Sequence, residues 1–300
     1  MKKIGTVVVL LFVLIVWLPL AGGQAVQPGI PVFVSIVPQA FFLERLGGNR
    51  VDVTVLIGEG QSPHSYEPTP KQMAKLAAAR AFFSIGVPAE KGVMRKIRQI
   101  HRNLLIVETH RGVPFRYLDE RHDDHGQGHE KRSAVQGGKE PDPHIWMDPK
   151  LVKIQARNIQ MALQQLDPLH RQEYEANLKA FLADLDRVDA RIARSLAPFR
   201  GGRMYVYHPA FGYFAEAYGL KQIPIEVEGK QPSARQLADL IDRAKRDKVK
   251  VMFVQPQFSR KGAEIIAKAI GGVVVPINPL APDYLENMEK IAIEVEKGLR

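Results

Sequence analysis

The chain has 300 residues, of which 45% are hydrophobic and 25% charged, and its mean hydropathy is −0.16. This composition excludes a disordered chain and a membrane protein with several spans, and the length fits two domains of ordinary size. The 42 Lys and Arg against 32 Asp and Glu give a net charge of +10, which favours anionic surfaces but does not by itself indicate nucleic acid. Because the sequence has no cysteine, disulfides, thiolate metal sites, cysteine nucleophiles and a lipid-modified cysteine are excluded. Any site for a soft metal therefore has to use histidine.

Residues 1–25 have the layout of a secretory signal peptide. Two lysines precede an apolar run at residues 4–20, and Gly23-Gln24-Ala25 provides a small-x-small cleavage signal. Cleavage there predicts an exported, periplasmic or otherwise extracytoplasmic protein that begins near Val26. An uncleaved N-terminal anchor is the alternative, because the apolar run is close to the shortest length that spans a membrane.

Short β-branched runs alternate with helical patterns in both halves of the chain, which predicts an α/β protein with parallel sheets flanked by helices. The expected strands are residues 32–37, 51–57, 81–85, 104–107, 204–207, 249–254 and 273–277, and the expected helices include 38–46, 211–218, 262–270 and one that begins near residue 70.

A long helical pattern separates the two halves. Residues 170–196 contain neither glycine nor proline and carry apolar residues at helical spacing, which predicts a helix of about 25 residues and about 40 Å. We therefore expect an N-terminal α/β lobe at 26–169, a linking helix at 170–198 and a C-terminal α/β lobe at 199–300. A stiff helix between the lobes limits hinge motion.

Three histidines lie at junctions that precede helices. His64 and His208 each follow a predicted strand, and His144 lies just before a helix expected to begin at Pro149. The carboxyl ends of strands are where open α/β sheets bind their ligands. A lone histidine is more often structural, but three in one kind of position indicate a metal site. Three neutral imidazoles and one further group suit tetrahedral Zn²⁺, whereas Mg²⁺ and Ca²⁺ require an oxygen-rich site.

Four segments in the same order resemble the signature segments of a known family. They are Ser62-Pro63-His64-Ser65-Tyr66-Glu67-Pro68, Asp142-Pro143-His144-Ile145-Trp146-Met147-Asp148-Pro149, Tyr207-His208-Pro209-Ala210-Phe211 and Glu228-Gly229-Lys230-Gln231-Pro232-Ser233. The family is that of the zinc- and manganese-binding proteins of bacterial ABC importers, the TroA-like group, and the sequence looks most like its high-affinity zinc uptake members. The resemblance covers nearly the whole mature chain. It implies two lobes joined by a long helix, with one metal ion in the cleft between them, bound by His64, His144 and His208.

The fourth ligand of this family is usually an aspartate in an Asp-Pro-Leu segment, and the matching stretch here is Asn278-Pro279-Leu280. Asn278 can coordinate the ion through its carbonyl oxygen, hydrogen-bond a metal-bound water, or take no part while another carboxylate substitutes. We favour the carbonyl or the water. A neutral fourth group disfavours manganese more than zinc, because Mn²⁺ prefers carboxylate oxygens. Three nearby carboxylates are candidates to orient a histidine or fill the gap, although a solvated loop charge is the expected role of each: Glu67, Glu226 and Glu228.

The segment at about residues 117–143 is expected to be a mobile loop, and its histidines resemble a shortened form of the family's histidine-rich loop. The candidate auxiliary ligands are His122, His125 and His129, accompanied by Asp123, Asp124 and Glu130. Such a loop would capture zinc weakly, because ordering it costs conformational entropy. A solvated linker is an equal alternative.

Five further side chains have expected roles. Trp146 and Tyr207 flank predicted ligands, so they either keep water out of the cleft or pack in the core. His101, His110 and His170 lie in helical or strand-edge settings without partners and are expected to be structural.

The leading hypothesis is an exported, monomeric solute-binding protein that captures Zn²⁺ and passes it to an ABC permease in the membrane, without catalysis. Zinc affinity is expected to fall as the pH drops through the ordinary histidine pKa of about 6.5. A Mn²⁺-specific protein of the same family is one alternative. A three-histidine zinc hydrolase is another, although the sequence has no His-Glu-x-x-His helix, no Gly-x-Ser-x-Gly elbow and no evident general base. Nucleic-acid binding lacks a zinc-finger spacing or a ribonucleoprotein motif.

Overall fold

The computed structural model describes residues 29–101, 103–117, 141–226 and 231–300. Several predictions fall outside these residues: the signal peptide at 1–25, the loop histidines His122, His125 and His129 with their acidic neighbours, and Glu228. In the described part of the chain, no helix is both long and apolar enough to cross a membrane.

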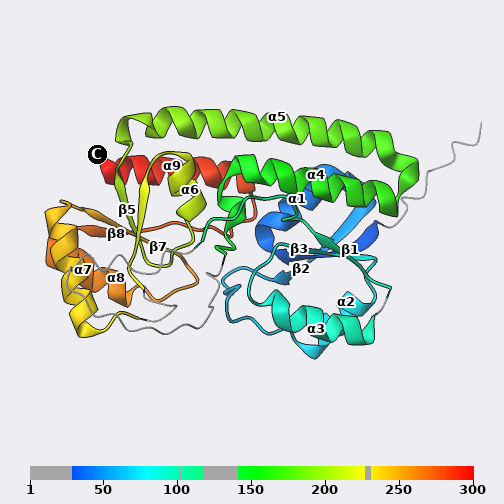
Figure 1. Ribbon diagram of the computed structural model, residues 1–300, viewed down its shortest axis with the longest axis horizontal. Helices are drawn as coiled ribbons and strands as arrows, with labels where there is room; N and C mark the ends of the chain where they lie inside the picture. Colours follow the sequence, from blue (N-terminus) through cyan, green and yellow to red (C-terminus); the bar gives the residue numbers. More distant parts are fainter. Residues whose placement is uncertain (1–28, 102, 118–140, 227–230) are drawn as a thin grey trace, which may run out of the picture.

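The first half of the chain forms a sheet of four parallel strands. These are β1 (Ile30–Ile36), β2 (Val51–Ile57), β3 (Ala81–Ser84) and β4 (Leu105–Glu108), in the order β2-β1-β3-β4 (Figure 1). All four were predicted, within two residues at each end. The side chains of β1 are buried without interruption from Val32 to Ile36, so both faces of the sheet are covered, as is typical of parallel sheets.

Three helices follow the first three strands: α1 (Val37–Gly47), α2 (Pro70–Ala77) and α3 (Glu90–Ile100). The start of α2 shows why the helix begins where the sequence predicts. Thr69 is the N-cap and its hydroxyl accepts a hydrogen bond from the backbone N–H of Gln72, while Pro70 occupies the first helical position. The cap therefore fixes the end of the loop that leads from β2 into α2.

The second half repeats the topology of the first. Strands β5 (Arg203–Val206), β6 (Lys221–Pro224), β7 (Val251–Val254) and β8 (Val273–Pro276) are parallel and lie in the order β6-β5-β7-β8. Helices α6 (Gly212–Ala217), α7 (Ala234–Arg246) and α8 (Lys261–Ile270) accompany them. Strand β6 was not predicted, because Lys-Gln-Ile-Pro has one β-branched residue and ends in proline.

Three longer helices cover one side of the two sheets: α4 (Pro149–Leu166) beside the first sheet, α9 (Tyr284–Leu299) beside the second, and α5 (Arg171–Leu196). Short 3₁₀ turns complete the described elements: η1 (Gly48–Arg50), η2 (Ile145–Met147), η3 (Pro168–His170) and η4 (Ala197–Phe199). Helix α5 has 26 residues, about 39 Å at 1.5 Å per residue, and runs past both halves along the top of Figure 1. It packs against α1, α4 and α9. The predicted long helix is confirmed, and so is the fold class of two helix-flanked parallel sheets.

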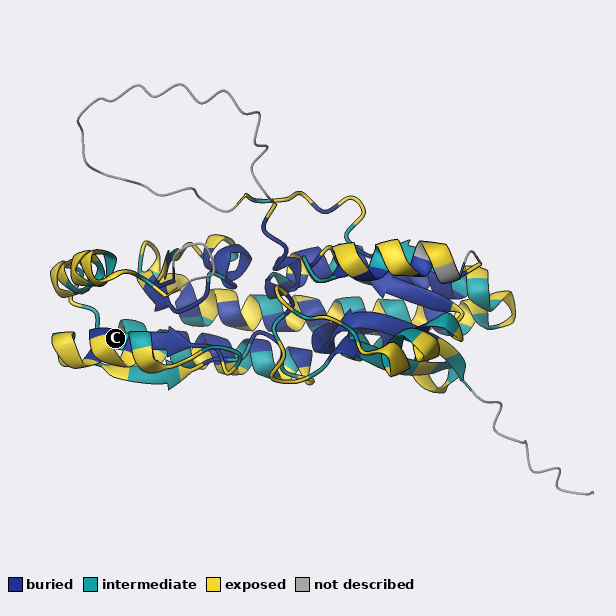
Figure 2. Ribbon diagram, turned by 90° about the horizontal axis from the view of Figure 1, so that it is seen from below, coloured by how far each residue is buried: buried dark blue, intermediate teal, exposed yellow. Residues whose placement is uncertain are grey.

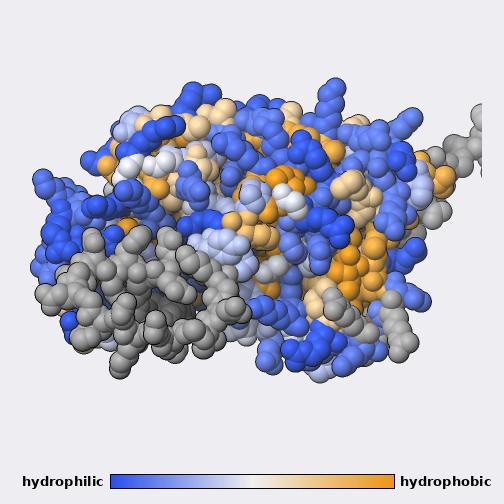
Figure 3. Space-filling model, viewed as in Figure 1, coloured by the Kyte–Doolittle hydropathy of each residue, from blue (hydrophilic) through white to orange (hydrophobic). Residues whose placement is uncertain are grey.

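One hydrophobic core runs through both halves. It contains buried residues of the first sheet, such as Val34, of α5, such as Phe181, and of one face of the second sheet, such as Val206. A smaller core lies on the other face of the second sheet and includes Tyr205 and Tyr207. In Figure 2 the strands are largely dark blue, and the outward faces of the helices are yellow. The face seen in Figure 3 is mostly hydrophilic, with a smaller apolar area to the lower right.

Candidate metal centre

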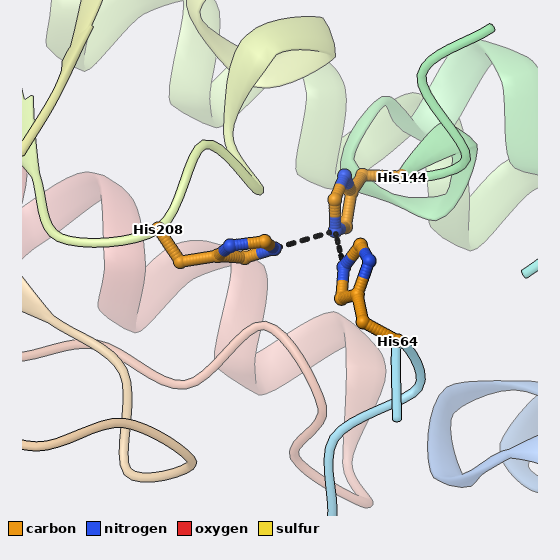
Figure 4. Close-up of side chains that lie close together, drawn as sticks. All are labelled: His64, His144 and His208. Atoms are coloured by element: carbon orange, nitrogen blue, oxygen red, sulfur yellow. Dashed lines mark hydrogen bonds between the residues drawn. The ribbon is translucent and has the colours of Figure 1, made fainter. Parts of the chain in front are cut away.

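The three predicted histidines converge on one point between the two halves. His64 comes from the loop between β2 and α2, His144 immediately precedes η2, and His208 lies two residues beyond β5. Figure 4 shows the three rings pointing toward one another. The Nε2 atom of His144 lies 3.4 Å from Nε2 of His64 and 3.3 Å from Nε2 of His208. Each ring offers one nitrogen, and these three nitrogens all lie within 4.8 Å of one another.

Buried carboxylates hold two of the rings from behind. Nδ1 of His144 lies 2.7 Å from Oδ1 of Asp142, and Nδ1 of His208 lies 2.5 Å from Oε1 of Glu226. Asp142 is fully buried and Glu226 is 6% exposed. A second-shell carboxylate of this kind fixes the tautomer of a metal-binding histidine and makes its other nitrogen a better ligand. The expected role of Glu226 as a solvated loop charge is therefore wrong, and the role of Asp142 was not predicted.

These contacts determine which nitrogens are free. An ionised carboxylate can only accept hydrogen bonds, so the proton of each neutral ring resides on Nδ1. Nε2 of His144 and Nε2 of His208 then both carry lone pairs, and these face each other at 3.3 Å. Two lone pairs at that distance repel unless a cation lies between them. The polarity of the two rings therefore matches a bound cation.

The spacing of the nitrogens matches zinc. A Zn–N bond is about 2.0–2.1 Å, and two ligands of an ideal tetrahedron at that distance are about 3.3–3.4 Å apart. The two Nε2 separations around His144, 3.4 and 3.3 Å, agree with this value. Two of the three nitrogen separations thus fit a tetrahedral ion.

Burial disfavours the protonated form of two of the rings. It is the main cause that lowers the pKa of His64 to about 3, and the neighbouring charges of His144 and His208 lower it further. Burial also lowers the pKa of His208, and this outweighs the opposite effect of the hydrogen bond with Glu226. A neutral ring is the form that binds a metal, so protons compete with the ion at these two rings at a lower pH than the 6.5 assumed from the sequence.

The backbone of the ligand segments is held by buried polar groups. The N–H of His208 donates to Oε1 of Gln255 over 3.1 Å, and Nε2 of Gln255 donates to the carbonyl of His208 over 2.7 Å. Asp142 binds His144 with one oxygen and Nη1 of Arg116 with the other, at 2.5 Å. Burial raises the pKa of Asp142, but the charge and hydrogen bonds of His144 outweigh it, so the net shift is downward. The carboxylate therefore stays ionised behind the ring.

One residue from the second half joins the two ends of the segment that contains residues 118–140. The hydroxyl of Tyr213 in α6 accepts a hydrogen bond from the N–H of Arg116 and donates one to the carbonyl of Asp142, both over 3.0 Å. Tyr117 and Pro141 also form a β-bridge there. The segment that carries His144 is thus fixed to the half that carries His208.

Mostly apolar residues surround the three rings in a small chamber. The chamber is lined by Pro63, His64, His144, Trp146, His208, Ala210, Gln257, Phe258, Pro279 and Leu280. The ring of Phe258 stacks on His208 with centroids 4.6 Å apart and an interplanar angle of 19°. Trp146 is buried in the wall and its Nε1 donates to the carbonyl of Pro279 over 2.8 Å. Tyr207 is not part of the lining and packs in the smaller core instead.

Comparison with known proteins places the chain in a family. Residues 32–298 match the family model described as "Zinc-uptake complex component A periplasmic", ZnuA. The chain belongs to the ZnuA family. The resemblance to the metal-binding proteins of ABC importers is thereby confirmed.

Relatives within the ZnuA family are similar over most of the chain. The "High-affinity zinc uptake system protein ZnuA" of Bacillus subtilis (strain 168) is 29% identical over 263 residues, which cover 86% of this chain and 81% of that protein. The "Zinc-binding protein AdcA" of Streptococcus pyogenes serotype M3 is 26% identical, but the match covers 93% of this chain and only 56% of AdcA. The chain thus spans just over half the length of AdcA. A solved structure titled "Crystal structure of ZnuA" is 38% identical with a TM-score of 0.82, and the match covers 91% of this chain and 100% of that one.

Asn278, at the position of the usual ZnuA-family aspartate, is turned to other partners. Its Oδ1 accepts hydrogen bonds from the N–H of Leu280 and from Nε2 of Gln257, each over 3.0 Å. Its backbone carbonyl accepts from Nδ2 of Asn287 over 2.7 Å. Asn278 is not among the residues that line the chamber. The side-chain oxygen Oδ1 of Asn278 thus already accepts two hydrogen bonds.

The other predicted side chains lie apart from the three rings. Glu67 is exposed, which fits the solvated charge expected of it. His170 does have a partner, since its Nδ1 lies 2.6 Å from Oδ2 of Asp167 just before α5, so the expectation that it lacks one is wrong. His110 and His101 are half-buried, and burial lowers the pKa of His110.

Proposed function

We propose that this chain captures one Zn²⁺ ion with His64, His144 and His208 and passes it to an ABC permease in the membrane. The observation that carries the proposal is the pair of Nε2 separations around His144, which equal the ligand spacing of tetrahedral zinc. The zinc uptake named in the family description and in the relatives' names supports the choice of cargo.

The chemistry of the chamber favours zinc over manganese. Among the described residues, its lining contains three imidazoles and no carboxylate, and Mn²⁺ prefers carboxylate oxygens. Asp142 and Glu226 supply negative charge from behind the rings, which lowers the energy of a bound dication without adding an oxygen ligand. Zinc, a good partner for imidazole, is therefore the cargo we propose.

The same lining argues for a carrier rather than a hydrolase. A zinc hydrolase needs a group that accepts a proton from the metal-bound water. No Asp or Glu lines the described chamber, and the two buried carboxylates behind it are engaged with the Nδ1 atoms of His144 and His208. Apolar side chains, among them Trp146 and Phe258, make up most of the rest of the lining.

We propose further that one chain acts alone, because all three histidines belong to it and meet within it. The functional units are the lobes at 26–169 and 199–300, with the linking helix at 170–198. Export, by the segment at 1–25, would place the chain on the side of the membrane where an importer receives its substrate. The periplasmic location in the family description supports this placement.

The test is a metal titration of the untagged chain from residue 26, stripped of metal, with a competing chelator. We expect one tightly bound Zn²⁺ per chain and much weaker Mn²⁺ binding, with the zinc site lost in His64→Ala. The hydrolase alternative is checked by adding zinc to the same preparation with a panel of esters and peptides. Failure to bind either metal stoichiometrically, or zinc-dependent turnover of the panel, would overturn the proposal.

A further inference from the structure

The chamber contains one polar side chain besides the histidines, the amide of Gln257. This residue lies in the loop between β7 and α8, at the carboxyl end of an inner strand of the second sheet. No signature segment found in the sequence includes it.

The hydrogen bonds around Asn278 determine how the Gln257 amide is turned. The backbone N–H of Leu280 can only donate, so the side-chain atom of Asn278 that it contacts is the oxygen, Oδ1. Gln257 contacts the same oxygen over 3.0 Å and must do so with its NH₂ group, Nε2. The other end of the amide, Oε1, is therefore directed away from Asn278.

Oε1 of Gln257 has no hydrogen-bond partner among the residues that the structure describes. In the described residues it is one of a few buried side-chain polar atoms without a hydrogen bond. Of the residues that carry such atoms, Gln257 alone lines the chamber with the three histidines. Buried carbonyl oxygens in native proteins are normally satisfied by protein, water or a ligand, so this oxygen is available to a partner in the chamber that Gln257 lines.

We infer that Oε1 of Gln257 supplies the fourth polar contact of the bound ion, directly or through one metal-bound water. The inference rests on the proposed zinc site, whose three histidines leave one tetrahedral position to be filled. Asn278 is then a positioning residue that acts through Gln257 rather than on the ion. An asparagine serves this purpose, because its oxygen accepts from both Leu280 and Gln257.

The first experiment measures zinc affinity by chelator competition in Gln257→Leu and Gln257→Glu. The leucine removes the oxygen at similar size, and we expect affinity to fall by about 10–100-fold, the usual effect of losing such a contact. The glutamate keeps an oxygen and adds a negative charge, but it loses the NH₂ group that donates to Asn278, so its affinity should fall by less than about 10-fold. Gln155→Leu is the matched control, since Gln155 also has an unpartnered buried amide but does not line the chamber. Its affinity should not change.

Cobalt provides a second readout that does not depend on transport. The visible spectrum of bound Co²⁺ reports its ligand set. Weaker zinc binding in Gln257→Leu with an altered cobalt spectrum supports direct ligation, and weaker binding with an unaltered spectrum supports contact through water. Zinc binding in Gln257→Leu within twofold of the wild type would overturn the inference. If that variant does not fold, Gln257→Glu decides, and a fall of about 10-fold or more in its zinc affinity would count against the inference. Absence of binding in the wild type would instead defeat the proposed function.

A double-mutant cycle separates the role of Gln257 from that of Asn278. Asn278→Ala should weaken zinc binding in the wild type, because it releases the Gln257 amide, but should have little further effect once Gln257 is leucine. An undiminished effect of Asn278→Ala in the Gln257→Leu background would show that Asn278 contacts the ion independently, contrary to the inference. Thermal unfolding of each apo variant verifies that it is folded.

Discussion

The two sheets have the same topology but use the ends of their inner strands differently. Around the carboxyl ends of β1, β3 and the neighbouring edge strand β4, the side chains of Ser35, Gln39, Glu90 and Thr109 are buried and bind one another or nearby backbone. We call these four residues the closed polar cluster. After β5 and β7, Gln255 holds the backbone of His208 and leaves the imidazole directed into the chamber. The strand order therefore determines where a ligand site can form. The side chains there determine whether the position is filled by contacts within the protein or binds a ligand.

The largest loss of zinc affinity is expected from His208, which follows β5 and faces the chamber. His208→Ala removes a ligand and also leaves Glu226 buried without its partner. Zinc affinity should fall by more than the roughly 10–100-fold that is usual for an outer contact. Chelator competition measures the change, and retention of tight zinc binding would argue against His208 as a ligand.

A smaller loss of zinc affinity is expected from Glu226, the carboxylate that contacts His208. Glu226→Ala removes the acceptor that keeps the proton of His208 on Nδ1, so zinc affinity should fall by about 10–100-fold. Glu67→Ala is the control, because Glu67 is exposed and should leave the affinity unchanged. Equal effects of the two variants in the same titration would contradict the role given to Glu226.

A substitution in the closed polar cluster should lower the stability of the fold and leave zinc affinity unchanged. Ser35→Ala removes a buried hydroxyl that donates to Oε1 of Glu90. The loss of such a bond costs about 1–3 kcal/mol of unfolding free energy. Denaturant unfolding of the apo protein measures this cost. Zinc affinity of the folded variant should match the wild type, and a large change would show that the closed polar cluster also serves the metal.

The smallest effect expected is on the titration of His64. Its pKa is lowered to about 3, so its ring should show no protonation between pH 8 and pH 5 in NMR spectra of the apo protein. Between about 3 and 6.5 the unfolded chain binds more protons at this ring than the folded one, so acidification below pH 6.5 destabilises the apo fold through His64. A ring that titrates near 6.5 would show that it is solvated in the absence of zinc.

The sequence predicted the fold where a signal was local and strong. The β-branched run at residues 51–57 and the uninterrupted helical pattern before residue 196 both appear in the structure as predicted. β6 was missed because an edge strand of four residues, two of them polar and one proline, carries little local signal. Its existence depends on pairing with β5, which is a tertiary interaction.

That omission also explains the error about Glu226. The pairing of β5 with β6 ends at Val206 and Pro224, and two residues further along each segment the side chains of His208 and Glu226 meet. Without β6 in the prediction, nothing in the sequence indicated that Glu226, 18 positions after His208, contacts the His208 ring. The three ligand histidines were predictable because motifs surround them, whereas the orientation of Asn278 toward Leu280 and Gln257 depends on a loop conformation that no motif specifies.

The division of the second sheet between two cores affects how the chain fluctuates. One face of β5 belongs to the core shared with α5, and the other belongs to the smaller core that α7 and α8 cover. Phe258 packs against the smaller core and also lines the chamber, so the chamber is closed partly by residues of that core. We expect this smaller packed unit to open locally more readily than the larger core. An ion bound by His208 and its partners makes that opening more difficult. Amide hydrogen exchange in α7 and α8 should therefore slow when zinc is added, although neither helix touches the ion.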